Sequence, residues 1–106
     1  MNKTGPFVKT LDGARQFKRI LGNSKKKRGL ASGFVILKKR AAVGLHNTGK
    51  REEVLVILQG TAQVSIADKR FILKKGTVLY IPPDTLHNVE NSHARLLKYL
   101  YVTAGI

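Results

Sequence analysis

The stretch GLHNTGKREEVLVILQG, residues 44–60, joins a polar turn to an apolar run and decides how the fold is interpreted. Residues 54–58 are all aliphatic, and Gln59-Gly60 follows them as a turn. A short apolar run bounded by turn residues is typical of a buried strand. We therefore expect residues 54–59 to form a strand that is buried on both sides. One side would face a barrel interior and the other a second sheet or a partner subunit.

Similar short segments continue along the rest of the chain. They are rich in Val, Ile, Leu and Tyr, which favour strands, and turn residues separate them. The expected strands are residues 33–38, 41–46, 54–59, 62–67, 71–73, 77–81, 87–90 and 95–102. Regular short strands joined by turns predict an antiparallel sandwich or barrel.

The segment LDGARQFKRILG near the N-terminus allows two interpretations. Apolar residues recur in it at helix-like spacing, namely Ala14, Phe17, Ile20 and Leu21. Asp12 would cap such a helix, but the same segment also suits an edge strand. The following SKKKRG, residues 24–29, predicts an exposed loop. We expect residues 1–32 to be a basic N-terminal extension packed on a barrel of residues 33–106, in a single domain overall.

Charge is distributed unevenly between the two halves of the 106-residue chain. Residues 1–51 contain 14 Lys or Arg against one acid, whereas residues 52–106 contain six against five. A field of this sign favours anionic partners such as nucleic acid, an acidic lipid surface, or a phosphorylated or carboxylated small molecule. The alternative is a solvated surface without a partner.

Composition also excludes several kinds of site. The chain has no cysteine, so a metal must be held by imidazole, carboxylate or backbone oxygen. We find neither a secretory signal nor an apolar run long enough to span a bilayer. The expectation is a cytoplasmic protein that does not associate with a membrane.

His46 stands before a short polar turn, and the pair Glu52-Glu53 stands after it. His46 and Thr48 share a face if their strand continues through both residues. The turn is short enough to bring a glutamate of the next strand close to His46. Because Glu52 and Glu53 are neighbours in a strand, only one of them can face inward.

A second stretch, GTVLYIPPDTLHNVEN, covers residues 76–91. Proline cannot occupy a central ladder position, so Pro82-Pro83 mark a sharp corner at the end of a strand. His87 opens the next strand just after that corner. A histidine in this position is well placed to point inward.

Together the two stretches resemble the paired motifs of the cupin superfamily, over about residues 33–103. The first motif is Gly, five residues, His, one residue, His, three or four residues, Glu, six residues, Gly. The second is Gly, five residues, Pro, one residue, Gly, two residues, His, three residues, Asn. The corresponding residues here are His46, Thr48, Glu53, Gly60, Gly76, Pro82, His87 and Asn91. The six-residue gap before Gly60 selects Glu53 over Glu52.

The resemblance implies a small single-domain cupin of the cupin-2 type, with an all-β double-stranded β-helix, or jelly-roll barrel. Cupins usually bind a divalent metal through both first-motif histidines, the glutamate and the second-motif histidine. This chain departs from the motif glycines at Arg40, which suggests a different turn, and at Asp84. Thr48 replaces the second histidine and is a poor ligand at neutral pH. The implied ligand set is therefore His46, Glu53 and His87.

Two histidines and one carboxylate suit Fe(II) with open positions, or tetrahedral zinc with one bound water. The resemblance also allows manganese or nickel. Thr48 would then hydrogen-bond a bound water or substrate. Further polar residues predicted to line the pocket are Gln59, Tyr80 and Asn91.

Three functions remain open from the sequence. The first is a metal-dependent oxygenase, isomerase or lyase acting on a small, anionic molecule. The second is a metal-free cupin that binds a small ligand without catalysis. The third is a basic nucleic-acid-binding protein, ranked last because no known nucleic-acid motif is visible. A homodimer is expected, since small cupins commonly pair. We assign no role to His93 and a packing role to Tyr99 and Tyr101.

Overall fold

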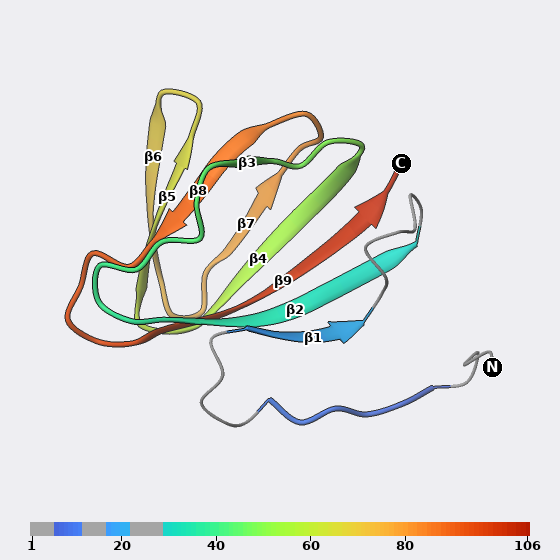
Figure 1. Cartoon of the computed structure of the whole chain (residues 1–106), viewed down its shortest axis with the longest axis horizontal. Helices are drawn as coiled ribbons and strands as arrows, with labels where there is room; N and C mark the ends of the chain where they lie inside the picture. Colours follow the sequence, from blue (N-terminus) through green and yellow to red (C-terminus); the bar gives the residue numbers. More distant parts are fainter. Residues whose placement is uncertain (1–5, 12–16, 22–28) are drawn as a thin grey trace.

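The computed structural model describes residues 6–11, 17–21 and 29–106, and this part of the chain forms two antiparallel sheets without a helix (Figure 1). The strands are β1 (Phe17–Leu21), β2 (Leu30–Leu37), β3 (His46–Asn47), β4 (Arg51–Gln59), β5 (Thr61–Ile66), β6 (Lys69–Lys74), β7 (Val78–Ile81), β8 (Leu86–Glu90) and β9 (Leu97–Gly105). The larger sheet has the order β1-β2-β9-β4-β7, and the smaller has the order β3-β8-β5-β6. The barrel is not closed, but the predicted all-β jelly-roll fold is confirmed.

The hydrophobic core lies between the two sheets. Strand alternation directs every second residue inward, so Leu55 and Ile57 of β4 are each only 1% exposed. The smaller sheet contributes Val64 from β5 and Val89 from β8 to the same cluster. Burial of these branched side chains supplies the main free energy that holds the two sheets together.

The outer face of β4 differs from the sequence expectation. Val54 and Val56 point away from the core and are only half-buried, while Leu58 is exposed. The expectation that a second sheet buries this side was therefore wrong, and burial against a partner subunit stays a prediction. Among the described residues, no second sheet covers the outer face of β4.

Residues 41–46 were expected to form a strand, but only His46 is assigned to one. Arg40 and Gly44 have φ values of +69° and +108°, which interrupt an extended backbone. The segment still follows β8 through isolated hydrogen bonds, such as that from the amide of Val43 to the carbonyl of Val89 at 2.9 Å. Residues 41–45 therefore lead to the site as an irregular connection and not as a regular β-strand.

The N-terminal segment follows the edge-strand interpretation where it is described. β1 pairs antiparallel with β2 and places Phe17 opposite Val35 at the edge of the larger sheet. The predicted helix cap Asp12 and residues 24–28 of the predicted basic loop lie outside the described residues.

The two positions where the chain lacks a motif glycine share one backbone conformation. Arg40 and Asp84 have φ values of +69° and +52°, in the left-handed region that glycine adopts at least cost. The substitution at Arg40 therefore does not remove the left-handed backbone that a glycine would provide. Gly60 is retained at φ +83°, where an added Cβ would clash with the carbonyl oxygen of Leu96. The β4–β5 turn therefore needs a glycine for space as well as for φ.

Within the described ranges, we find no helix that is long and apolar enough to cross a membrane.

Candidate metal centre

Three potential metal ligands converge from both sheets. His46 begins β3 and His87 lies in β8, where the two form a directly opposed pair in the smaller sheet. Glu53 points toward them from β4 of the larger sheet. The potential ligand atoms of the three residues all lie within 4.8 Å of one another. A cation between the sheets could therefore be held by all three side chains.

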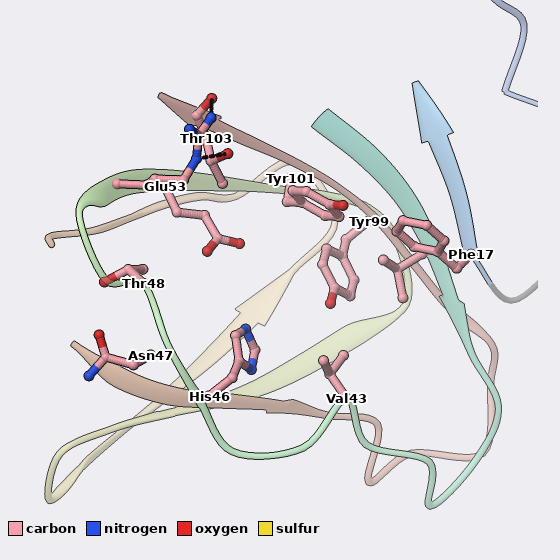
Figure 2. A pocket seen from close by; sticks show the side chains of 11 residues that line it. Phe17, Val43, His46, Asn47, Thr48, Glu53, Tyr99, Tyr101 and Thr103 are labelled. Atoms are coloured by element: carbon pink, nitrogen blue, oxygen red, sulfur yellow. Dashed lines mark hydrogen bonds between the residues drawn. The ribbon is translucent and has the colours of Figure 1, made fainter. Parts of the chain in front are cut away.

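Burial increases from the pocket toward its floor. His87 is 1% exposed and Glu53 has a side chain 11% exposed, whereas His46 is exposed. The His87 Nε2 atom lies 3.5 Å from Glu53 Oε1, and the two imidazole ring centres are 4.0 Å apart. Figure 2 shows His46 and Glu53 extending into the pocket from different elements. The arrangement leaves the centre open on the His46 side.

The tautomer of both histidines follows from their hydrogen bonds. His46 Nδ1 lies 2.8 Å from the carbonyl oxygen of Gly44, and His87 Nδ1 lies 2.9 Å from that of Thr85. A carbonyl oxygen can only accept, so Nδ1 carries the proton in each ring. In the neutral rings Nε2 then has a free lone pair, as a metal ligand requires.

His87 Nε2 is buried and has no hydrogen-bond partner among the residues that the structure describes. A buried polar atom without a partner costs free energy, commonly about 1–3 kcal/mol. Coordination to a divalent cation beside the Glu53 carboxylate would satisfy this nitrogen. The donor set of two imidazoles and one carboxylate also suits iron, manganese, zinc or nickel. The residues present therefore fit a divalent metal.

Electrostatics around His87 point in two directions. Burial lowers its pKa, but the Glu53 carboxylate and the Thr85 carbonyl raise it by more, so the pKa lies above its usual value. The same carboxylate that favours a proton on this ring would favour a cation beside it.

Thr48 is engaged in a role that the sequence did not suggest. Its hydroxyl donates to the carbonyl of Pro82 at 2.7 Å and accepts from the amide of Thr85 at 3.0 Å. The Thr48 amide also donates to the carbonyl of Thr85, which is the oxygen that accepts from His87 Nδ1. Thr48 therefore joins Pro82 to Thr85 and fixes the corner whose Thr85 carbonyl orients the His87 ring. Hydrogen bonding to a bound water or substrate stays a prediction.

The other polar residues predicted to line the pocket lie elsewhere. Tyr80 is on the outer face of β7, where its hydroxyl donates to Glu52 at 2.8 Å. Gln59 is exposed at the end of β4. Asn91 is fully buried and donates to the carbonyls of Leu37 and Arg95 at 2.9 and 2.8 Å. Strand parity accounts for Tyr80, because it precedes the inward-facing Ile81.

A pocket of about 340 Å³ opens beside the three ligands. Its wall includes residues that the sequence analysis assigned to packing or did not single out: Phe17, Val35, Val43, Arg51, Tyr99, Tyr101 and Thr103. Figure 2 shows the aromatic side chains on the wall away from Thr48. Alternation in residues 97–105 could have indicated that Tyr99, Tyr101 and Thr103 share one face. No sequence signal tied Phe17 to them.

Comparison with known proteins identifies the family. The family model for the cupin domain matches residues 33–103, which is more than half of the chain. The chain therefore belongs to the cupin family, as the two motifs predicted.

Similar proteins agree on the fold. An uncharacterized protein of Methanocaldococcus jannaschii is 35% identical over 65 residues, covering 61% of this chain and 50% of that protein. This chain therefore spans only half the length of that relative. A cupin domain from Schizosaccharomyces pombe is 20% identical, with a TM-score of 0.76 over 85% of this chain and 60% of that one. A predicted oxalate decarboxylase from Thermotoga maritima is 23% identical, with a TM-score of 0.75 over 85% and 79%.

Proposed function

We propose that this protein is a metal-dependent cupin in which His46, Glu53 and His87 hold one divalent cation. The observation that carries this proposal is the buried His87 Nε2, which faces the Glu53 carboxylate and has no hydrogen-bond partner in the described part of the chain. The backbone carbonyls that fix both imidazole tautomers support the same conclusion, because they leave a lone pair on each Nε2 in a cluster whose potential ligand atoms lie within 4.8 Å of one another.

A cation bound there would supply Lewis acidity to a small molecule in the adjoining pocket. Glu53 and His87 would hold it from the floor, and His46 would complete the set at the open side. Oxygenase, isomerase and lyase chemistry all suit three protein ligands with open positions. The excess of basic residues favours an anionic substrate. The resemblance to a protein described as a predicted oxalate decarboxylase also supports a small carboxylate.

The metal-free and nucleic-acid-binding alternatives are not favoured. A cupin that binds a ligand without metal would leave the buried His87 nitrogen unsatisfied unless its ligand filled that role. Binding to nucleic acid would leave the converging His46, Glu53 and His87 side chains without a role.

The metal proposal is tested directly by measuring metal content with inductively coupled plasma mass spectrometry. The protein should be tag-free and purified without nickel-affinity chromatography. We expect close to one divalent ion per chain, lost in His87→Ala and retained in His93→Ala. His93 is a matched control because it is exposed in a loop. Absence of metal from the native chain after reconstitution with iron, manganese, zinc and nickel would overturn the proposal.

We also propose that the chain forms a homodimer through the outer face of its larger sheet. Val78 and Tyr80 of β7 are 62% and 52% exposed there, beside the half-buried Val54 and Val56. Exposed apolar side chains gathered in this way are typical of an interface. Light scattering after gel filtration should give twice the chain mass for the native protein and the chain mass for Val78→Lys. A native monomer would contradict the dimer and leave the metal proposal unaffected.

A further inference from the structure

An aromatic pair forms the pocket wall at the edge of the larger sheet. The rings of Phe17 and Tyr101 are stacked with centroids 6.3 Å apart and an interplanar angle of 14°. Both residues line the pocket, and Phe17 remains 45% exposed although it belongs to a sheet. An exposed ring that lines a cavity is available to a ligand in a way that a core ring is not.

Gly33 leaves the space that the Tyr101 ring occupies. The two residues are directly paired between β2 and β9. A Cβ added at Gly33 would lie 2.6 Å from three atoms of the Tyr101 side chain, its hydroxyl oxygen included. The ring therefore lies across the strand where any other residue would place a side chain. This arrangement places the ring of Tyr101 beside Phe17 on the pocket wall.

The pocket also has a cationic side. Arg51 lines it and is held by the hydroxyl and carbonyl oxygens of Thr103, at 3.0 and 3.2 Å. Arg51 lies two residues before Glu53 in β4, so the two side chains share one face. Arg19 is not among the pocket-lining residues, and its guanidinium lies 5.9 Å from the ring centre of Phe17, at the aromatic side. Glu53 is the one acidic side chain among the described residues that line the pocket.

From this arrangement we propose that the pocket binds a small aromatic carboxylate, with its ring against Phe17 and Tyr101 and its carboxylate on the side of Arg51 and the metal ligands. The inference rests on the proposed function, because the bound cation forms part of the anionic subsite. A volume of about 340 Å³ is near the lower end of ligand pockets, so one substituted ring suits it better than a fused system.

The test measures the binding of three probes to the zinc-loaded and the metal-free protein by isothermal titration calorimetry. Benzoate has both features, cyclohexanecarboxylate keeps the charge without the aromatic face, and benzamide keeps the ring without the charge. We expect benzoate to bind about threefold to tenfold more tightly than cyclohexanecarboxylate. We expect benzamide to bind at least about tenfold more weakly than benzoate. Equal affinity of benzoate and either comparison probe, or no binding of benzoate, overturns the inference.

Two variants locate the effect. Phe17→Leu keeps an apolar side chain without a ring, so benzoate should lose its advantage over cyclohexanecarboxylate. Phe7→Leu is the matched control, since Phe7 is 54% exposed and does not line the pocket. Gly33→Ala should weaken benzoate binding in the same way by displacing the Tyr101 ring, and serves if Phe17→Leu does not fold. An unchanged benzoate preference in both pocket variants overturns the inference.

Metal analysis of the same samples separates this inference from the proposed function. Metal retained without a preference for benzoate overturns the ligand class alone. A preference for benzoate that depends on Phe17, in protein that binds no metal under any loading condition, overturns the metal proposal and supports the aromatic wall.

Discussion

The same strands line both ends of the space between the two sheets, but the side chains at the two ends differ. One end is packed with apolar side chains, and the other contains the candidate metal site and its pocket. At the closed end, the inward residues Leu37, Ile57 and Leu97 of β2, β4 and β9 are each 0–1% exposed. Four residues away on the same faces, the open end has Gly33, Glu53 and Tyr101. The strands continue without a break, so the change of side chains alone turns core into site.

This difference indicates how the open end tolerates unfavourable groups. At the closed end, folding removes apolar surface from water, and this burial stabilises the protein. That free energy keeps the two sheets packed together. It therefore also offsets the cost of the buried His87 Nε2, which has no hydrogen-bond partner among the described residues. Functional groups commonly occupy positions of this kind, where the scaffold compensates for a local cost.

The largest expected effect is on stability at the closed end. Ile57→Ala should lower the free energy of unfolding by about 3–4 kcal/mol, because it leaves a cavity in a fully buried cluster. Urea denaturation measures the change. Ile72→Ala, at a residue 55% exposed on β6, is the control and should cost much less. Equal losses in the two variants would mean that the closed end does not dominate stability.

The next effect compares neighbouring glutamates of β4 at the open end. Glu53→Gln should weaken metal binding by more than about 100-fold, because losing a ligand exceeds the usual effect of an outer-shell change. Glu52→Gln should leave metal binding unchanged, since Glu52 points outward to Tyr80. Competition with a chromophoric chelator gives both affinities. Equal weakening would show that charge alone, and not ligand geometry, retains the metal.

A smaller effect is expected from the corner that orients His87. Thr48→Val removes the hydroxyl that joins Pro82 to Thr85 and should weaken metal binding about tenfold. Thr48→Ser keeps the hydroxyl and should restore most of the affinity. Chelator competition and thermal unfolding of the metal-free variants distinguish the two roles of Thr48. Wild-type affinity in Thr48→Val would contradict a positioning role.

The smallest effect concerns ionisation outside the pocket. The hydrogen bond from Tyr80 to Glu52 raises the pKa of the phenol, with smaller contributions from burial and from the charge of Glu52. The protonated phenol donates to the carboxylate, whereas the phenolate would be repelled by it. Glu52→Gln should therefore lower the Tyr80 pKa toward its usual value, as followed by NMR titration. Glu53→Gln should not, and an equal shift in both would place Tyr80 nearer the pocket.

Several features of the site could be predicted from the sequence because they depend on local spacing. Proline at the corner before His87, the apolar run of β4 and the motif distance from Glu53 to Gly60 are all visible in the chain. The facing of Tyr80 also followed from alternation once Ile81 was known to be buried, but the sequence alone did not show which parity was inward.

By itself, the sequence determined the family, the all-β class and the three candidate ligands, because each depends on residue type and separation along the chain. Only the tertiary structure brought Phe17 of the N-terminal segment beside Tyr101 of the last strand, and only it gave Thr48 its clamp on Thr85. These contacts join residues far apart in the chain, and their partners are chosen by strand pairing and sheet packing. No local pattern encodes that choice, since pairing depends on the registers of all the strands that lie between.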